Sequence, residues 1–214
     1  MSPLLDMRIL ELLIARFCHD LAGPVAAVGN GAEILADSGP DFAGEAMRLV
    51  ADSANAAAIR LAFYRFAFGV GGDGAAAASA SDLAARFFAS TAIACDYSPS
   101  ARLLPPSWQK LACNLLLVGA DGLPRGGTLA VFADVRDDLV LDAVGEAAAL
   151  APELTAALSL ALPVAALSPR TVPAYLAGLL AQMLGRRLIA CGVAAGRFRV
   201  SAAAAGPPAG AGGG

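Results

Sequence analysis

Two apolar stripes with helical spacing dominate the first third of the chain. Both advance in alternating steps of three and four residues, which place side chains on one face of an α-helix. The first lies within residues 3–37 and the second within residues 42–68, and Ser38-Gly39-Pro40-Asp41 between them is typical of a helix stop and restart. The stripes hold Ile14, Phe17, Leu21, Pro24, Val28, Gly31 and Leu35, then Met47, Val50, Ala54, Ala57, Leu61, Tyr64 and Phe68. The sequence therefore predicts a hairpin of two long helices, bent where proline interrupts the first.

Such a hairpin has one apolar seam, which two helices alone bury poorly. Two copies of the hairpin bury it by forming a four-helix bundle. We therefore expect a homodimer through residues 1–69. The alternative is that a second domain of the same chain covers the seam.

The first helix carries His19, the only histidine among the 214 residues. It lies two residues from the stripe positions Phe17 and Leu21, so at about 100° per residue it points away from the stripe into solvent. Three of its four neighbours one turn away are small, which leaves the ring open to another protein; they are Ala15, Arg16, Ala22 and Gly23. An exposed histidine without a function is the plain alternative. The adjacent Asp20, the small neighbours and Pro24 favour a functional one.

Composition excludes several classes of function. Although 57% of the residues are hydrophobic, many of them are alanine, and we find no run of about 20 apolar residues for a membrane span. Asp6, Arg8 and Glu11 argue against a signal peptide. The net charge of −3 argues against nucleic-acid binding. We expect a cytoplasmic protein that binds neither membranes nor nucleic acid.

The four cysteines give no metal or disulfide framework. They are widely spaced and form no Cys-x-x-Cys pair, and one histidine cannot complete a usual zinc pattern. We interpret them as reduced thiols, which fits a cytoplasmic location. They are Cys18, Cys95, Cys113 and Cys191.

The remainder of the chain has a different character. Glycine, alanine and serine dominate residues 70–81, which is typical of a linker. A second domain is expected over residues 82–202, with helices at 82–90, 105–118, 151–162 and 168–184, and strands at 92–97, 128–135, 139–144, 188–191 and 197–202. Residues 203–214 are rich in alanine, glycine and proline and are expected to be disordered.

The order of these elements resembles the ATP-binding domain of histidine kinases. Local sequence agrees: Asn114–Leu117 and Leu123–Thr128 look like the asparagine box and the turn after it, and Arg186–Ser201 looks like the terminal hairpin. The resemblance implies an α+β chain, in which a helical hairpin is followed by a kinase-like α/β sandwich.

The residues that bind ATP in those kinases are replaced here. Val118 occupies the position of a second asparagine, and Val144 and Glu146 replace both glycines of the glycine box near Asp142. Ser168–Ala174, reading SPRTVPA, stands where a glycine-rich lid is expected. Glycines allow a backbone to approach phosphates, whereas branched side chains and proline obstruct it. We therefore expect the kinase-like fold without nucleotide binding. Two interpretations of Asp142 stay open: it binds a purine weakly, or it is an incidental acid on a core strand.

Residues 15–24, reading ARFCHDLAGP, resemble the H-box of two-component signalling proteins. There, a phosphoryl-carrying histidine is followed by an acid and, five positions on, by a proline, as are His19, Asp20 and Pro24. A histidine-bearing hairpin joined to a kinase-like domain without ATP motifs resembles the ChpT-type histidine phosphotransferases of alphaproteobacteria. The resemblance covers roughly residues 3–202.

This resemblance implies an intermediate of a phosphorelay. The receiver domain of a hybrid histidine kinase would pass a phosphoryl group to His19, which would pass it to the receiver of a response regulator. Asp20 would orient or polarise the site, and Ala22 and Gly23 would form the contact floor for the receiver. Arg16 would hold phosphoryl oxygens or a receiver acid, although a solvated helix face explains it equally well. The receiver supplies Mg²⁺, so no cofactor is expected.

Two other classes of function remain open. One is a non-catalytic dimeric signalling adaptor in which His19 has no role. The other is an ATP-dependent histidine kinase, against which the missing glycines argue.

Overall fold

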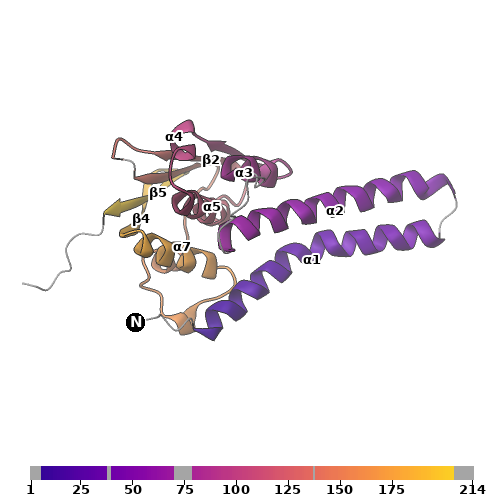
Figure 1. The fold of residues 1–214 in the computed structure, drawn as a ribbon, viewed down its shortest axis with the longest axis horizontal. Helices are drawn as coiled ribbons and strands as arrows, with labels where there is room; N and C mark the ends of the chain where they lie inside the picture. Colours follow the sequence, from indigo (N-terminus) through magenta and orange to yellow (C-terminus); the bar gives the residue numbers. More distant parts are fainter. Residues whose placement is uncertain (1–5, 38–39, 70–78, 137, 205–214) are drawn as a thin grey trace, which may run out of the picture.

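The computed structural model describes residues 6–37, 40–69, 79–136 and 138–204. A long helical hairpin projects from an α/β domain (Figure 1), as the sequence predicts. Its helices are α1 (Met7–Asp37) and α2 (Pro40–Phe68). α2 begins two residues before the predicted start, because proline is well suited to the first turn of a helix. α1 changes direction part-way along its length in Figure 1, and Pro24 lies inside it.

Within the single chain, α2 covers the predicted stripe on α1 over its outer part only. The stripe residues from Phe17 to Leu35 are half-buried or buried, and a Cβ at Gly31 would lie 2.7 Å from Cγ2 of Val50, so the two helices meet closely there. Ile14 is 51% exposed in the single chain, so α2 does not cover it, and its place in a dimer seam stays a prediction. At this end of α1, Ile9 is buried, and the helix contacts α7 (Val172–Met183) and the 3₁₀ turn Val164–Ala166 of the second domain.

The stripe on α2 is likewise covered only in part within the single chain. Met47 and Leu61 are 57% and 59% exposed in the single chain, whereas Phe63 and Ala67 are buried. The second domain contacts α2 through α3 (Ala80–Phe88) and α5 (Pro106–Asp121), and near the C-terminal end of α2 this packing buries a face beside the stripe. At the base of the hairpin the second domain thus covers residues beside the predicted stripe, and the homodimer that would cover the rest of the stripe stays a prediction.

The second domain contains one five-stranded sheet in the order β1-β2-β3-β5-β4. Strand β1 runs parallel to β2, and the other neighbours are antiparallel. The strands are β1 (Ile93–Tyr97), β2 (Gly127–Ala133), β3 (Leu139–Val144), β4 (Arg186–Ala194) and β5 (Arg197–Ala204). Strand β5 extends two residues past its predicted end at Ala202, so the prediction of disorder is wrong for Ala203 and Ala204, which pair with Arg187 and Arg186. Residues 205–214 of the predicted disordered tail lie outside the described part.

Helices cover one face of this sheet (Figure 1). They are α3 (Ala80–Phe88), α4 (Pro99–Arg102), α5 (Pro106–Asp121), α6 (Pro152–Leu158) and α7 (Val172–Met183), with a 3₁₀ turn at Val164–Ala166. The sequence prediction missed α4 and the 3₁₀ turn, although the Ser98-Pro99 pair is a helix start: Ser98 Oγ accepts from the Ala101 amide. Helix α3 begins inside the predicted linker because Ser79 Oγ caps it; residues 70–78 lie outside the described part.

Helix α5 fixes which side of the sheet is the core. A Cβ at Gly119 would lie 2.8 Å from Cδ2 of Leu129 and of Leu141, so glycine is what lets α5 approach the sheet. Leu141 therefore faces the helices, and its strand neighbour Asp142 faces the opposite side.

Polar contacts join the hairpin to this domain. Asn114 Nδ2 donates to the Ala67 carbonyl at 2.8 Å, and Lys110 Nζ donates to the Gly69 carbonyl at 2.6 Å. Carbonyls at the end of a helix have no partner within it. The second domain therefore satisfies the C-terminal end of α2.

By length and hydropathy, α1 is the one helix in the described ranges that could cross a membrane. In this structure it packs lengthwise on α2. Arg16 of α1 forms ion pairs with Asp20 of the same helix and with Asp121 of the second domain. Such pairs are typical of an amphipathic helix on a protein surface.

Candidate functional site

His19 lies on α1 near the junction of the hairpin and the second domain. Its side chain is 85% exposed, as the helical spacing predicts. The ring nitrogen Nδ1 lies 3.2 Å from Oδ1 of Asp20. The ring is thus accessible from solvent while one of its nitrogens has a partner.

Asp20 is held firmly beneath the ring, with a side chain only 15% exposed. Its Oδ2 accepts hydrogen bonds from the Tyr64 hydroxyl at 2.6 Å and from Arg16 Nε at 2.8 Å. Burial alone would raise the pKa of Asp20, but the hydrogen bonds from Tyr64, Arg16 and His19 outweigh it and lower the pKa. Asp20 is therefore a carboxylate at neutral pH.

This charge state determines which nitrogen of His19 can react. A carboxylate can only accept, so Nδ1 must carry the hydrogen of the His19–Asp20 contact. The neutral imidazole then has its lone pair on Nε2. Burial, together with the Asp20 carboxylate, raises the pKa of Tyr64, so its hydroxyl stays protonated and donates.

The backbone of Asp20 is held as well. Residue 24 would normally donate its amide to this carbonyl, but Pro24 has no N–H. Arg60 of α2 replaces this missing donor, because its Nη1 donates a hydrogen bond of 2.8 Å to the Asp20 carbonyl. The two helices are thus joined at the residue next to His19.

Arg16 connects the hairpin to the second domain. Its Nη1 and Nη2 lie 3.3 and 3.4 Å from the carboxylate oxygens of Asp121, at the end of α5, while its Nε reaches Asp20. Burial would lower the pKa of Arg16, but Asp121 and Asp20 outweigh it and raise the pKa. Arg16 is therefore neither a solvated residue nor a free one, since its guanidinium already binds two acids.

A depression of about 470 Å³ opens beside the imidazole, between the hairpin and the second domain. It is lined by Ala15, Arg16, His19, Asp20, Asp121, Pro169 and Arg170. Ala22 and Gly23 are exposed one turn farther along α1, and a Cβ at Gly23 would meet nothing within 4 Å. The surface around His19 is thus open enough for a protein partner.

Four residues of this site were not selected from the sequence. Tyr64 and Arg60 lie on the helix that packs against α1, and Asp121 and Arg170 come from the second domain. Tyr64 was assigned to the apolar seam, and nothing local marks Asp121, which is 105 residues from its partner Arg16. A contact between residues so far apart in the chain produces no periodic pattern by which the sequence could reveal it.

The positions that correspond to the ATP motifs have structural partners. Asp142 binds two arginines of β5: Arg199 Nε at 2.6 Å and Nη2 at 2.7 Å, and Arg197 Nη2 at 2.7 Å. Val118 is buried in the core, and Glu146 is paired with Arg125. The expectation of an incidental acid at Asp142 is wrong, because this carboxylate anchors β5.

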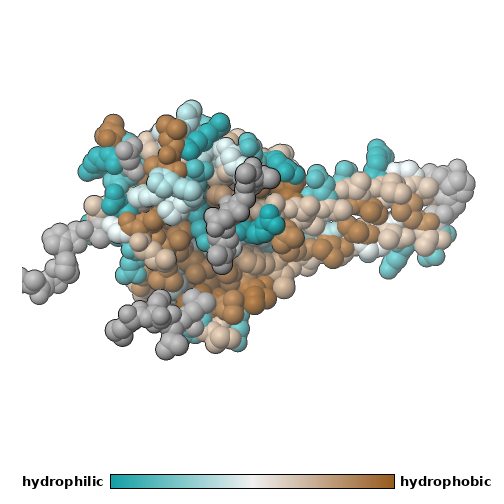
Figure 2. Space-filling model, viewed as in Figure 1, coloured by the Kyte–Doolittle hydropathy of each residue, from teal (hydrophilic) through white to brown (hydrophobic). Residues whose placement is uncertain are grey.

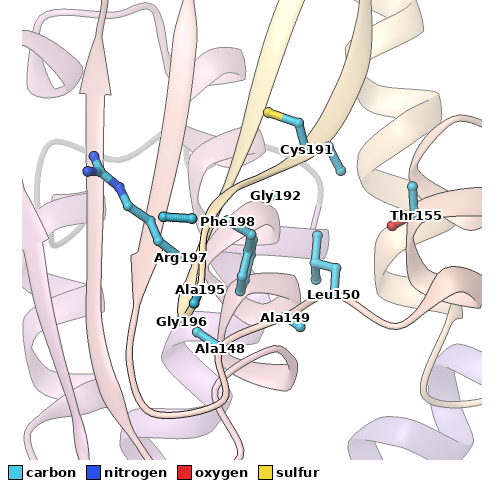
Figure 3. A pocket seen from close by; sticks show the side chains of 12 residues that line it. Ala148, Ala149, Leu150, Thr155, Cys191, Gly192, Ala195, Gly196, Arg197 and Phe198 are labelled. Carbon is cyan, nitrogen blue, oxygen red and sulfur yellow. The ribbon is translucent and has the colours of Figure 1, made fainter.

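Figure 3 shows a second hollow, of about 380 Å³, where Ala148–Leu150 face the hairpin of β4 and β5. Alanine and glycine dominate its lining, and Arg197 points away from it in this view. The part of the chain that the structure describes also has no cluster of three or more metal-binding side chains. The depression beside His19 is therefore the candidate site.

Comparison with known proteins identifies relatives. The model of the family "Histidine phosphotransferase C-terminal domain" matches residues 77–191. The protein phosphotransferase ChpT of Brucella abortus (strain 2308) is 33% identical over 183 residues, which span 83% of this chain and 87% of that protein. A solved structure described as a bacterial phosphotransferase has a TM-score of 0.76 and 31% identity, and covers 94% of this chain and 98% of its own.

Proposed function

This chain belongs to the ChpT-type histidine phosphotransferases, and we propose that its His19 relays a phosphoryl group between the aspartates of two receiver domains without the use of ATP. The observation that carries the proposal is an exposed imidazole whose Nδ1 faces a buried, ionised Asp20. The chain is a protein phosphotransferase of a phosphorelay, and the phosphohistidine step is the proposed part.

In the proposed first step, the lone pair of His19 Nε2 attacks the phosphorus of an aspartyl phosphate on the donor receiver. The N–P bond forms as the P–O bond to the aspartate breaks, and the aspartate leaves as a carboxylate with that electron pair. His19 keeps its Nδ1 hydrogen, and Asp20 compensates the positive charge that develops on the ring. No proton is gained or lost.

The second step is the reverse reaction with another partner. A carboxylate oxygen of the acceptor receiver attacks phosphorus, the N–P bond breaks, and its electron pair returns to Nε2. The receiver supplies the Mg²⁺ that neutralises the phosphoryl oxygens, so this chain requires no cofactor of its own. The partners are expected to be the receiver of a hybrid histidine kinase and those of response regulators.

The surroundings of His19 would form the docking surface. Ala22 and Gly23 offer a flat floor on α1, and Arg170 offers an exposed cation on the second domain. Receiver active sites are rich in acids, so a cation beside the depression favours their approach. Arg16 contributes through its contact with Asp20 rather than as a free arginine.

The apolar surface of the hairpin supports a homodimer. Brown, hydrophobic side chains follow the hairpin in Figure 2, and a groove of about 550 Å³ runs between α1 and α2. Leu13, Phe17, Leu21 and Leu61 are among its lining. A second copy would bury this surface in a four-helix bundle. We place the protein in the cytoplasm, where receiver domains act.

The absence of ATP chemistry is also part of the proposal. An adenine-binding acid must be free, whereas Asp142 is bound to Arg197 and Arg199 on the face of the sheet opposite the helices. The segment before α7 is a tight turn closed by hydrogen bonds between Ser168 and Thr171. Among the described residues, these contacts support a segment that does not act as the lid that kinases close over phosphates.

The deciding experiment is incubation with phosphorylated receiver domains, followed by detection of an acid-labile, base-stable phosphoryl group on the protein. The wild type should accept the label, and His19→Ala and His19→Gln should not, with unchanged folding because the side chain is exposed. Since the chain holds no other histidine, label on His19→Ala would refute the proposal. A wild type that binds receivers but never takes the label would identify an adaptor.

A further inference from the structure

We propose that Tyr64 and Asp121 are positioning residues for phosphotransfer, which act through Asp20: they hold its carboxylate so that one oxygen faces His19 Nδ1 and keeps Nε2 as the nucleophile. This inference rests on the proposed function and adds two residues to it, one from α2 and one from the second domain.

The contacts divide the Asp20 carboxylate between two tasks. Oδ2 accepts from both Tyr64 and Arg16, at 2.6 and 2.8 Å, while Oδ1 is the oxygen near His19. A carboxylate anchored through one oxygen cannot rotate freely about its terminal bond. The anchored oxygen therefore sets the direction of the other.

Tyr64 is built to hold this position. Its ring is buried, at 5% exposure, and stacks on Phe17 with centroids 4.8 Å apart and planes inclined by 16°. Phe17 lies on α1 three residues before Asp20, so the stack and the hydrogen bond join the same two helix turns. The hydroxyl is the one polar atom of a side chain that is otherwise part of the core.

Asp121 reaches Asp20 through Arg16. It is the last residue of α5, where a negative charge meets the negative end of the helix dipole and is unfavourable for the helix itself. Burial raises the pKa of Asp121, and Arg16 opposes this effect. Both the helix dipole and burial disfavour a charged Asp121. Its contact with the Arg16 guanidinium, which also binds Asp20, explains why an acid occupies this position.

The charged and titratable groups around Asp20 come from each element packed near it. They are Arg16 and His19 on α1, Arg60 and Tyr64 on α2, Asp121 on α5, and Arg170 before α7. Arg60 binds the backbone carbonyl rather than the carboxylate. The orientation of the carboxylate therefore depends on Tyr64 directly and on Asp121 through Arg16.

The single histidine gives this inference a direct readout. In ¹⁵N NMR of protein labelled at histidine, every imidazole signal comes from His19. At about pH 8, above the ordinary histidine pKa of about 6.5, the wild type should show the Nδ1–H tautomer. Free imidazole side chains in water prefer Nε2–H, so loss of the Asp20 contact shifts the signals toward that form.

Tyr64→Phe tests the direct contact. The variant keeps the stacking ring and should shift His19 toward Nε2–H. The maximal rate of phosphotransfer should fall about tenfold, the size expected for loss of one hydrogen bond to a charged group, with an unchanged KM for the receiver. Tyr97→Phe is the matched control, since its buried hydroxyl has no hydrogen-bond partner among the described residues; it should change neither quantity.

Asp121→Asn tests the contact through the second domain and should shift the tautomer and the rate in the same direction. Its control is Asp138→Asn, which loses the 2.9 Å ion pair with Arg186 in the same domain, away from the hairpin. If Asp121→Asn does not fold, Arg16→Lys serves instead, because an ammonium cannot span two acids as a guanidinium fork does.

A wild-type tautomer in Tyr64→Phe, or a slower transfer caused only by a higher KM, would overturn the inference. The tautomer measurement requires no receiver, so its result stands even if the wild type accepts no phosphoryl group. That second failure would count against the proposed function alone.

Discussion

Arg60 of α2 donates a hydrogen bond of 2.8 Å to the backbone carbonyl of Asp20 in α1. This carbonyl is the one that Pro24 leaves without its helical donor. The proline of the H-box-like segment thus has a structural consequence beyond the bend, because it frees an acceptor through which the second helix is fixed next to His19.

Arg60 and Pro24 should therefore be energetically coupled. Arg60→Ala should lower the free energy of unfolding by about 1 kcal/mol, since it leaves a carbonyl without its donor. In a Pro24→Ala background the same change should cost less, because the introduced alanine supplies a backbone amide. Urea unfolding of the four proteins gives the coupling energy. Arg48→Ala, an exposed arginine of α2, is the control, and an equal cost of Arg60→Ala in both backgrounds would contradict the relationship.

Gly23→Trp should block phosphotransfer from a receiver while the protein stays folded. The new side chain meets nothing within 4 Å in the chain itself, so it projects into the space that a receiver would occupy. Ala22→Trp should act similarly. Transfer is measured with a phosphorylated receiver and, in parallel, with phosphoramidate, which should still label His19.

The matched control for this steric test is Gly44→Trp, at a position on α2 that is equally open and distant from His19 in sequence. It should transfer at the wild-type rate. Normal transfer in Gly23→Trp would mean that receivers approach His19 from elsewhere.

Leu61→Glu should convert the proposed dimer to a monomer. Leu61 is 59% exposed in the single chain, so the monomer tolerates the charge, but a charge buried in a bundle core costs several kcal/mol. Light scattering reports the mass. Leu103→Glu, at an 88% exposed leucine of the second domain, should leave the mass unchanged. A folded dimer of Leu61→Glu would count against this interface.

Mg-ATP should not bind. Asp142 is occupied by two arginines, and Val118 fills the position of a second asparagine in the buried core. Isothermal calorimetry should show no heat beyond dilution, and no label should appear on His19 from ATP. Micromolar binding would show that the kinase-like domain keeps its ligand.

Asp142→Asn should destabilise the protein by about 1–2 kcal/mol at pH 7, a value reduced for the partial exposure of both arginines. Hydrogen bonds from Arg199, opposed by burial and aided by Arg197, lower the pKa of Asp142. A folded-state pKa below the unfolded one, about 3.9, gives stability that is present above that pH and lost as the pH falls through the folded pKa. Thermal unfolding of wild type and variant should therefore converge below about pH 4, and a constant difference would contradict this origin.

The sequence predicted the hairpin, the exposed position of His19 and the mixed α/β domain after it, because these follow from local spacing. Helical periodicity did not reveal that the second domain packs on the base of α2, where Phe63 and Ala67 are buried although they lie off the predicted stripe. The pattern shows that a stripe exists but not which turns of it are covered.

The candidate site was predicted only in part, because local spacing reveals the residues of one helix but not those that tertiary packing adds. His19, Asp20, Ala22 and Gly23 lie within five residues of one another, and the structure places them as helical geometry requires. Tyr64 and Asp121 come from elements that pairwise packing brings together, which no single segment encodes. The role of Asp142 could not be predicted because β3 is buried on both faces over most of its length. Alternation of polar and apolar residues therefore does not reveal on which face of the sheet the acid lies.

The contacts of Asn114 and Lys110 with the end of α2 have a consequence for partner selection. The two surfaces proposed to meet a receiver, one on the hairpin and one on the second domain, are therefore held at a fixed angle before it binds. Binding then does not pay the entropy of closing a hinge. Preorganisation of this kind also discriminates by shape, because a receiver that matches only one surface cannot recruit the other by moving it.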